Sequence, residues 1–158
     1  MAADALWVWP MRNAAAKGRA MTADISPILA TTLVAVGGAV GAALRYHAGQ
    51  WAGQWAVQLS GSGAQFPWGT LSVNVIGSLA MGLLAGWLAR QGTGAENLRL
   101  LLGVGLLGGF TTFSAFSLEM MQLVERGSAG LAIGYAGASV LAGLAALYIG
   151  LVVMRGAA

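Results

Sequence analysis

Three scarcities narrow the possibilities for this chain before any motif is considered. The 158 residues include no cysteine, which excludes a disulfide framework and thiolate metal ligands. Only 8% of the residues are charged, whereas soluble domains carry roughly a quarter. The eight basic and five acidic residues are too few and too scattered for a nucleic-acid surface. His47 is the one histidine, and no convergent acid–base set suggests an enzyme.

Apolar residues and glycine are abundant instead. Hydrophobic residues make up 58% of the chain, and the mean hydropathy is +0.74. Most of the 25 glycines lie inside the apolar runs, where small residues let membrane helices approach one another closely. Ser78, Gly82 and Gly86, for example, repeat every four residues and predict one smooth packing face. The composition therefore predicts an all-α integral membrane protein in contact with lipid.

The apolar runs predict four transmembrane helices inside one membrane domain of residues 25–155. These spans cover about residues 27–44, 68–88, 98–124 and 129–154. Residues 1–24 contain no run long enough to span, and we expect a tail that is disordered or lies upstream of the true start at Met21. Residues 48–67 are interpreted as a polar loop with Trp51 and Trp55 at the membrane interface, and His47 as a loop residue.

Four spans place both termini on one side of the membrane. Six Lys and Arg residues then lie on the terminal side and two, Arg45 and Arg126, on the other. This bias predicts cytoplasmic termini. A start at Met21 would reduce the count to three against two, and a chain with so little bias can insert in both directions and pair antiparallel with itself.

The third span contains an unusual stretch, GGFTTFSAFSLE, at residues 108–119. Two glycines followed by Thr111 and Thr112 are a poor helix interior, because glycine loses backbone entropy and β-branched threonine is stiff. We therefore predict a break in the third helix. A break frees backbone carbonyls at membrane depth, where they must face protein or a hydrated cavity. Such carbonyls suit a cation such as sodium.

Polar side chains inside the spans are few and usually mark function. Asn74 brings an amide, and the interrupted stretch brings hydroxyls. Tyr135 and Ser139 lie four residues apart on one face of the fourth span. Phe110, Phe113 and Phe116 form a row that Glu119 continues. Amides, hydroxyls and the positive edges of aromatic rings suit a small anion without trapping it at a fixed charge.

Each of these features has a plainer interpretation. The phenylalanine row can be packing, and Asn74 can join two helices by a hydrogen bond. Serine and threonine often bond back to their own helix. Arg45 can be an ordinary interfacial anchor. The interrupted stretch itself has little to recommend it as a spacer.

Three motifs together resemble the CrcB/Fluc family of fluoride channels over about residues 33–153. Residues 37–46 (GGAVGAALRY) match the family's Gly-Gly-x-x-Gly-Ala-x-x-Arg-aromatic signature. Residues 68–78 (WGTLSVNVIGS) match Gly-Thr-Leu-x-Val-Asn-x-x-Gly-Ser. Residues 108–119 match Gly-Gly-x-Thr-Thr-Phe-Ser-x-Phe-Ser-x-Glu. Three motifs in this order and spacing are highly specific.

The resemblance implies an antiparallel, dual-topology homodimer in the bacterial inner membrane, with two fluoride pores built from both subunits. It assigns Asn74 as a fluoride donor and Phe113 and Phe116 as ring-edge contacts. The rest of the implied path consists of Thr70, Thr112, Tyr135 and Ser139, with Arg45 in the vestibule and Glu119 as structural support. It also implies a central sodium ion held by the main-chain carbonyls of Gly108 and Thr111 from each subunit.

Two features depart from the family pattern. The tail before Thr22 is longer than the pattern needs, and Gly143 stands where the polar track of the fourth span often continues with a hydroxyl. The expected function is passive fluoride export, which would confer fluoride resistance. A drug/proton antiporter would need a carboxylate at mid-membrane, but the first two spans have no acid and Glu119 lies toward the end of its helix. A bundle that serves only as a scaffold would not explain the interrupted stretch.

Overall fold

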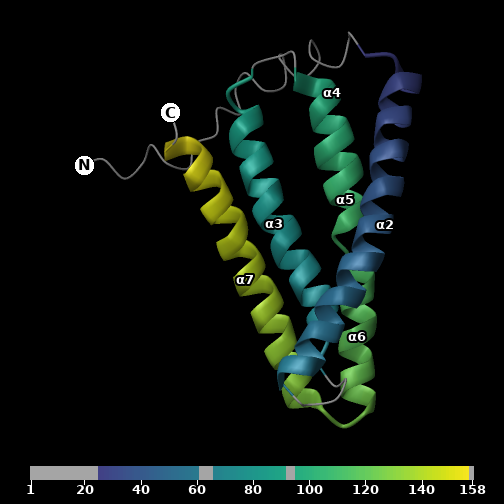
Figure 1. The fold of residues 1–158 in the computed structure, drawn as a ribbon, viewed down its shortest axis with the longest axis vertical. Coiled ribbons are helices and arrows are strands. Elements are labelled where there is room, and N and C mark those ends of the chain that lie inside the picture. Colours follow the sequence, from purple (N-terminus) through teal and green to yellow (C-terminus); the bar gives the residue numbers. More distant parts are fainter. Residues whose placement is uncertain (1–24, 61–65, 92–94, 157–158) are drawn as a thin grey trace.

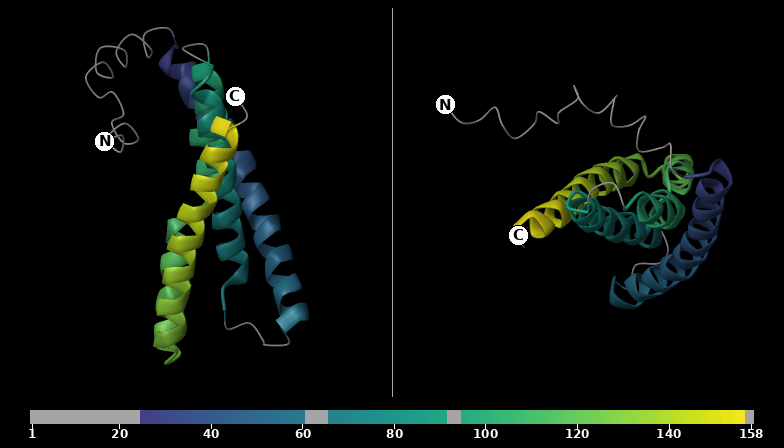
Figure 2. Two further views of the ribbon diagram at one scale, coloured as in Figure 1. Left: turned by 90° about the vertical axis from the view of Figure 1, so that its left-hand side faces the viewer. Right: turned by 90° about the horizontal axis from the view of Figure 1, so that it is seen from above.

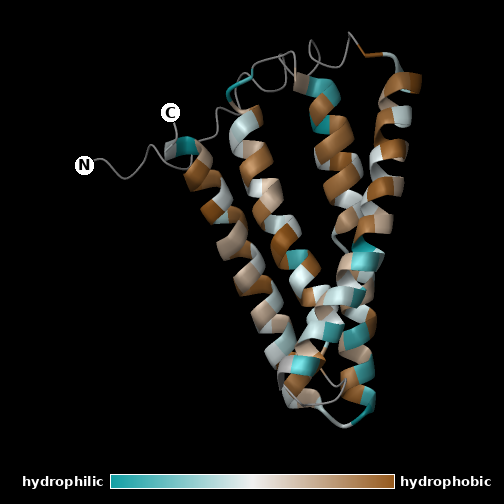
Figure 3. Ribbon diagram, viewed as in Figure 1, coloured by the Kyte–Doolittle hydropathy of each residue, from teal (hydrophilic) through white to brown (hydrophobic). Residues whose placement is uncertain are grey.

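The computed structural model describes residues 25–60, 66–91 and 95–156, and the expectations for the tail and for Met21 lie outside these residues. Every described element is helical (Figure 1). Four helical segments are long and apolar enough to cross a membrane, which confirms the predicted all-α class with four spans. They cover Pro27–Gln58, Trp68–Leu88, Glu96–Glu125 and Ala129–Gly156. Figure 3 shows hydrophobic residues along most of their length.

The helices form two pairs that converge at one end of the molecule and diverge toward the other (Figures 1 and 2). Helix α3 (Trp68–Leu88) packs along α7 (Ala129–Gly156). Helix α2 (Pro27–Ser60) packs against η2 (Arg99–Leu107), a π-helical segment in the first half of the third span. The start of α2 and the end of α7 lie at the same end of the molecule, as an even number of spans requires.

Small residues explain the close contact between α3 and α7. Gly82 and Gly86 are buried on α3, as their four-residue spacing predicts. A Cβ at Gly150 of α7 would lie 2.5 Å from the Leu79 carbonyl oxygen, and a Cβ at Gly82 would collide with the Leu147 carbonyl. Backbones at this separation gain dispersion contacts that larger side chains would prevent.

The first half of the third span depends on glycine in the same way. It consists of α4 (Glu96–Leu98), η2 and α5 (Gly108–Phe110). A Cβ at Gly105 would lie 2.9 Å from the Val34 carbonyl oxygen, and one at Gly109 would lie 2.6 Å from that of Gly38. The glycines of α2 and of the third span therefore face each other and bring the two backbones into contact.

The first helix is longer than its sequence predicts. Residues 48–60 were expected to belong to a loop, but α2 continues through His47 to Ser60. The segment has no proline and repeats Ala-Gly-Gln-Trp with a period of four residues, so its polar side chains share faces of a helix. With 34 residues, α2 is about 51 Å long, and its end extends beyond a hydrocarbon core of about 30 Å.

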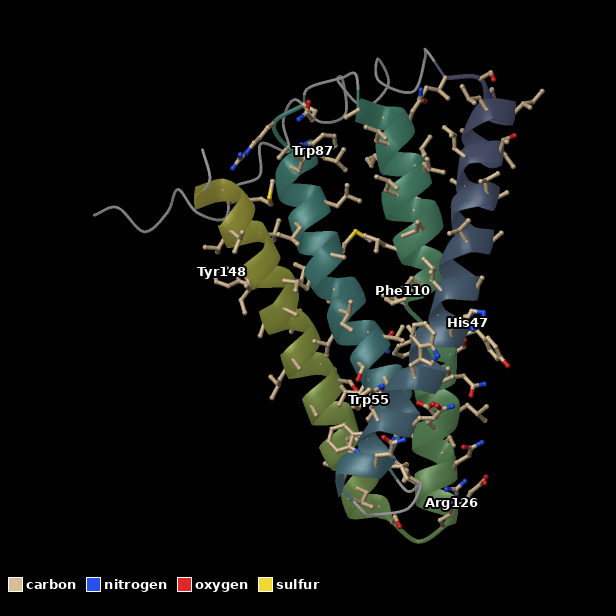
Figure 4. All side chains as sticks on the ribbon, in the orientation of Figure 1. His47, Trp55, Trp87, Phe110, Arg126 and Tyr148 are labelled. Atoms are coloured by element: carbon tan, nitrogen blue, oxygen red, sulfur yellow. The ribbon has the colours of Figure 1, made fainter. Side chains whose placement is uncertain are left out.

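The side chains at the end of α2 fit this placement. Trp51 and Trp55 are both about two-thirds exposed, as expected for indoles in an interfacial belt. Figure 4 shows His47 pointing away from the bundle, and Tyr148 likewise on the outer side of α7. Phe110 points inward, toward α3.

Candidate functional site

The site is organised around a two-residue junction in the third span. Helix α5 ends at Phe110, and α6 (Phe113–Glu125) begins after two residues of extended backbone. The dihedral angles φ and ψ are −83° and 156° at Thr111 and −148° and 125° at Thr112. The hydroxyl of Thr112 accepts a hydrogen bond of 3.2 Å from the Ala115 N–H, so threonine acts as the N-cap of α6.

Asn74 of α3 holds this junction through two hydrogen bonds to one residue. Its Nδ2 donates to the Thr112 carbonyl at 3.1 Å, and its Oδ1 accepts from the Thr112 N–H at 2.9 Å. The carboxamide thus pairs with the extended backbone as a neighbouring strand would. The plainer interpretation of Asn74, a bond between helices, is therefore part of its role. The second N–H of the amide is not used by either bond.

The pairing with Asn74 has a consequence for the Gly108 carbonyl. In a continuous helix the Thr112 N–H would donate to Gly108, four residues earlier. Here it donates to Asn74, so Gly108 loses its helical donor. The Thr111 N–H and hydroxyl both donate to the Leu107 carbonyl, each at 3.0 Å. Gly108 itself is an exposed residue.

A surface cavity of about 330 Å³ lies beside the junction, between α3, α6 and α7. Most of the predicted pathway residues line it: Asn74, Thr112, Phe113, Phe116 and Ser139. Thr111, predicted as a sodium ligand, lines it as well. No charged side chain is among its lining residues in the described part of the chain. The rings of Phe113 and Phe116 have centroids 5.6 Å apart and an interplanar angle of 39°. Phe113 is 79% exposed, so this wall is open on one side.

The polar side chains of this cavity are neutral and include hydrogen-bond donors. Ser139 Oγ is buried and has no hydrogen-bond partner among the described residues. A buried hydroxyl without a hydrogen-bond partner costs free energy, so a ligand that accepts a hydrogen bond from it would be stabilised there. Together with the unused N–H of Asn74, this hydroxyl gives the cavity a neutral, donor-bearing lining.

Glu119 is the centre of a second polar cluster. Thr70 Oγ1 donates to its Oε1 at 2.6 Å, and the Tyr135 hydroxyl donates to its Oε2 at 2.7 Å. One carboxylate therefore joins α3, α6 and α7. Tyr135 is fully buried against Phe116, with ring centroids 5.0 Å apart.

The predicted site residues do not all line one cavity, and Gly108 and Glu119 line neither the larger cavity nor a second, smaller one. Thr70 and Arg45 line a smaller cavity of about 130 Å³ on the other side of the junction. Thr112 lines both cavities and is the residue they share. Tyr135 lines neither of them and lies in a hydrophobic cluster with Leu123 and Ala132.

The sequence analysis did not predict that Ser78 and Met81 line the larger cavity. Ser78 was interpreted as part of a packing face because it begins a row of small residues. Its spacing of four residues from Asn74 was the available signal, since side chains at i and i+4 share a helix face.

The fold and the site together define a multi-pass membrane protein with a neutral, donor-lined path beside an extended junction at the centre of one span. Comparison with known proteins agrees with this class. The profile described as CrcB-like protein, Camphor Resistance (CrcB), matches residues 32–151. Because this match covers most of the chain, the protein belongs to the CrcB family.

Several relatives are similar over most of their length. A protein of Novosphingobium aromaticivorans named fluoride-specific ion channel FluC is 60% identical over 129 residues, which cover 82% of this chain and 98% of the relative. Proteins with the same name from Sphingopyxis alaskensis and Hyphomonas neptunium are 54% and 52% identical, over 77% and 78% of this chain. The matches cover 92% and 93% of those two relatives.

Proposed function

We propose that this protein is a fluoride-selective channel that exports fluoride passively and so confers fluoride resistance. The observation that carries the proposal is a cavity lined by uncharged side chains, where, among the described residues, Ser139 Oγ has no hydrogen-bond partner and one N–H of Asn74 is unused. The names of the relatives support fluoride as the ion. No catalytic step is needed, because the membrane potential moves the anion.

The physical basis of export is an acid trap. Neutral hydrogen fluoride crosses the bilayer and ionises in the cytoplasm, where the anion cannot leave through lipid. A negative-inside potential favours exit of the anion by about 2.3 kcal/mol per 100 mV. A pore with suitable donors is then sufficient for net export.

Fluoride holds its hydration water strongly, so a pore must replace that water with donors. In this chain the Asn74 amide and the Ser139 hydroxyl are suitably placed. The edges of Phe113 and Phe116 carry the positive part of the ring quadrupole and add a weaker attraction. The absence of a fixed cation among the lining residues in the described part of the chain favours release as well as entry.

A second copy of the chain completes the pathway in this proposal. Helix α6 packs on α7 and only slightly on α3, and its Phe113 ring is 79% exposed. A partner that covers this face would close the cavity and form two equivalent pores. The near-balanced charge count from Met21 is compatible with an antiparallel, dual-topology dimer in the bacterial inner membrane.

We include a structural sodium ion at the centre of this dimer. Its ligands would be the main-chain carbonyls of Gly108 and Thr111 from both subunits. The loss of the helical donor at Gly108 and the extended backbone at Thr111 make carbonyl ligands available, and hard cations prefer oxygen. Bound sodium would offset the carbonyl dipoles that would otherwise meet at the interface.

The proposal is tested by anion efflux from liposomes that contain the purified protein, with fluoride and chloride electrodes recording the same sample. We expect rapid fluoride loss while chloride is retained. Protein-free liposomes and the Asn74→Ala variant are the controls. Loss of both ions would contradict fluoride selectivity, and retention of both by a folded dimer would contradict the channel function itself.

A further inference from the structure

Ser78 is a residue of the larger cavity to which neither the motifs nor the comparisons assign a role. It lies one helical turn after Asn74 on α3 and on the same face. The Asn74 amide therefore has a hydroxyl beside it, one turn further along the cavity.

The hydroxyl of Ser78 does not bond back to its own helix, as three other hydroxyls in these helices do. Thr32, Thr111 and Ser117 each donate to the carbonyl four residues earlier, at 2.8, 3.0 and 2.9 Å. Such back-bonding is how a membrane helix usually satisfies a hydroxyl. Among the described residues, Ser78 Oγ makes no hydrogen bond. Its donor is therefore free, as is that of Ser139 across the cavity.

Gly143 of α7 keeps this hydroxyl open. A Cβ at Gly143 would lie 3.5 Å from Ser78 Oγ, in ordinary van der Waals contact. With glycine at this position, no side chain of α7 covers the hydroxyl at this level. Further along the cavity the lining side chains are apolar, from Met81 and Leu147. Ser78 is thus the last polar side chain of the lining on this side of Asn74.

We propose that Ser78 is a further anion-contacting residue, whose hydroxyl donates a hydrogen bond to fluoride at the end of the polar part of the path. Gly143 gives the ion access to that hydroxyl. The inference rests on the proposed fluoride channel and extends it. Ser78 of α3 provides a hydrogen-bond donor opposite Gly143, where α7 has no side-chain donor. A hydroxyl is suited to this place, since it donates without adding charge.

The test compares fluoride efflux from liposomes for a set of matched variants. Ser78→Ala should slow fluoride efflux by about fivefold to tenfold, the size expected for one lost hydrogen bond. Adding Gly143→Ser to Ser78→Ala should restore efflux, because the hydroxyl returns at the same level from the facing helix. Adding Gly143→Ala instead should not restore efflux, and this variant controls for the added Cβ.

A second pair keeps the test independent of packing at position 78. Ser78→Thr and Ser78→Val have nearly the same shape, but only threonine carries a hydroxyl. We expect Ser78→Thr to conduct several times faster than Ser78→Val. Equal efflux for this pair, or for Ser78→Ala and the wild type, would overturn the role of Ser78. Failure of the wild type to release fluoride would instead overturn the proposed channel, so the two failures are distinguishable.

Discussion

The two halves of the third span differ in how much of their surface is packed. The half before the junction packs against α2 through glycine, and Gly103, Gly105 and Leu107 are buried. The half after it, α6, has one buried residue, Leu123, and exposes the ring of Phe113. The first half therefore contributes more to the packing of the chain, whereas the second exposes the face that the proposed channel assigns to the ion path and to a second subunit.

The junction between the halves belongs to neither. Its backbone is extended, so it cannot satisfy itself as a helix does, and Asn74 supplies the missing partners from α3. Substitutions in these regions should therefore have different effects. The largest expected effect is loss of folding, the next is loss of conduction, and the smallest is a modest loss of stability.

The largest effect is expected where α2 packs against the first half of the third span. Gly41→Leu should prevent folding, because any Cβ at this position collides with the Leu106 carbonyl and lies 2.9 Å from the Phe110 N. Yield of monodisperse protein in detergent measures the result. Gly53→Leu on the same helix is the control, since a Cβ at Gly53 meets nothing within 4 Å. Equal yields would contradict the glycine packing.

Asn74→Ala should affect the junction and the path together. It leaves the N–H and carbonyl of Thr112 without their partner, at a cost of about 1–3 kcal/mol for each unsatisfied group, and removes the proposed donor. We expect a lower melting temperature. We also expect fluoride efflux to fall by about a hundredfold, because the variant loses both the pairing with the junction and the hydrogen bond to the ion. Ser72→Ala, on the same helix but outside both cavities, is the control. Undiminished efflux would rule out Asn74 as an essential donor.

Phe113→Ala should impair conduction without impairing the folding of the monomer. The ring is 79% exposed within one chain, so its loss should leave the folding of the monomer unchanged. Efflux should fall by about tenfold, in line with an edge contact worth up to about 1.5 kcal/mol. Leu118→Ala removes a side chain that is also exposed on α6 but does not line the cavity. The comparison fails if both variants conduct alike.

The smallest effect is expected where α6 is attached to the bundle. Thr70→Val removes one of the two hydroxyls that donate to Glu119 but keeps the shape of the side chain. The free energy of unfolding should fall by about 1 kcal/mol, and Tyr135 should retain the carboxylate. Thermal unfolding in detergent measures the change. A loss as large as that of Asn74→Ala would mean that Glu119 depends on Thr70 alone.

The sequence predicted the helices better than their ends. The apolar run at residues 68–88 coincides with α3, because its limits are set by Pro67 before it and a polar loop after it. The prediction for the first helix stopped too early, since residues 48–67 were interpreted as a polar loop, whereas α2 continues to Ser60. Glutamine and tryptophan at four-residue spacing are compatible with a helix that leaves the hydrocarbon core, so polarity alone was a poor guide to its end.

Membrane insertion, the four spans and the family motifs could all be inferred from the amino-acid sequence alone. Hydropathy and glycine spacing are local properties, and they can be read without knowing how the helices face one another. Three features became visible when the helices were seen packed together: Asn74 pairs with Thr112, Glu119 joins three helices, and Thr70 and Ser78 lie in different cavities. These contacts depend on the rotation of each helix about its axis, which is fixed by packing between segments distant in the chain.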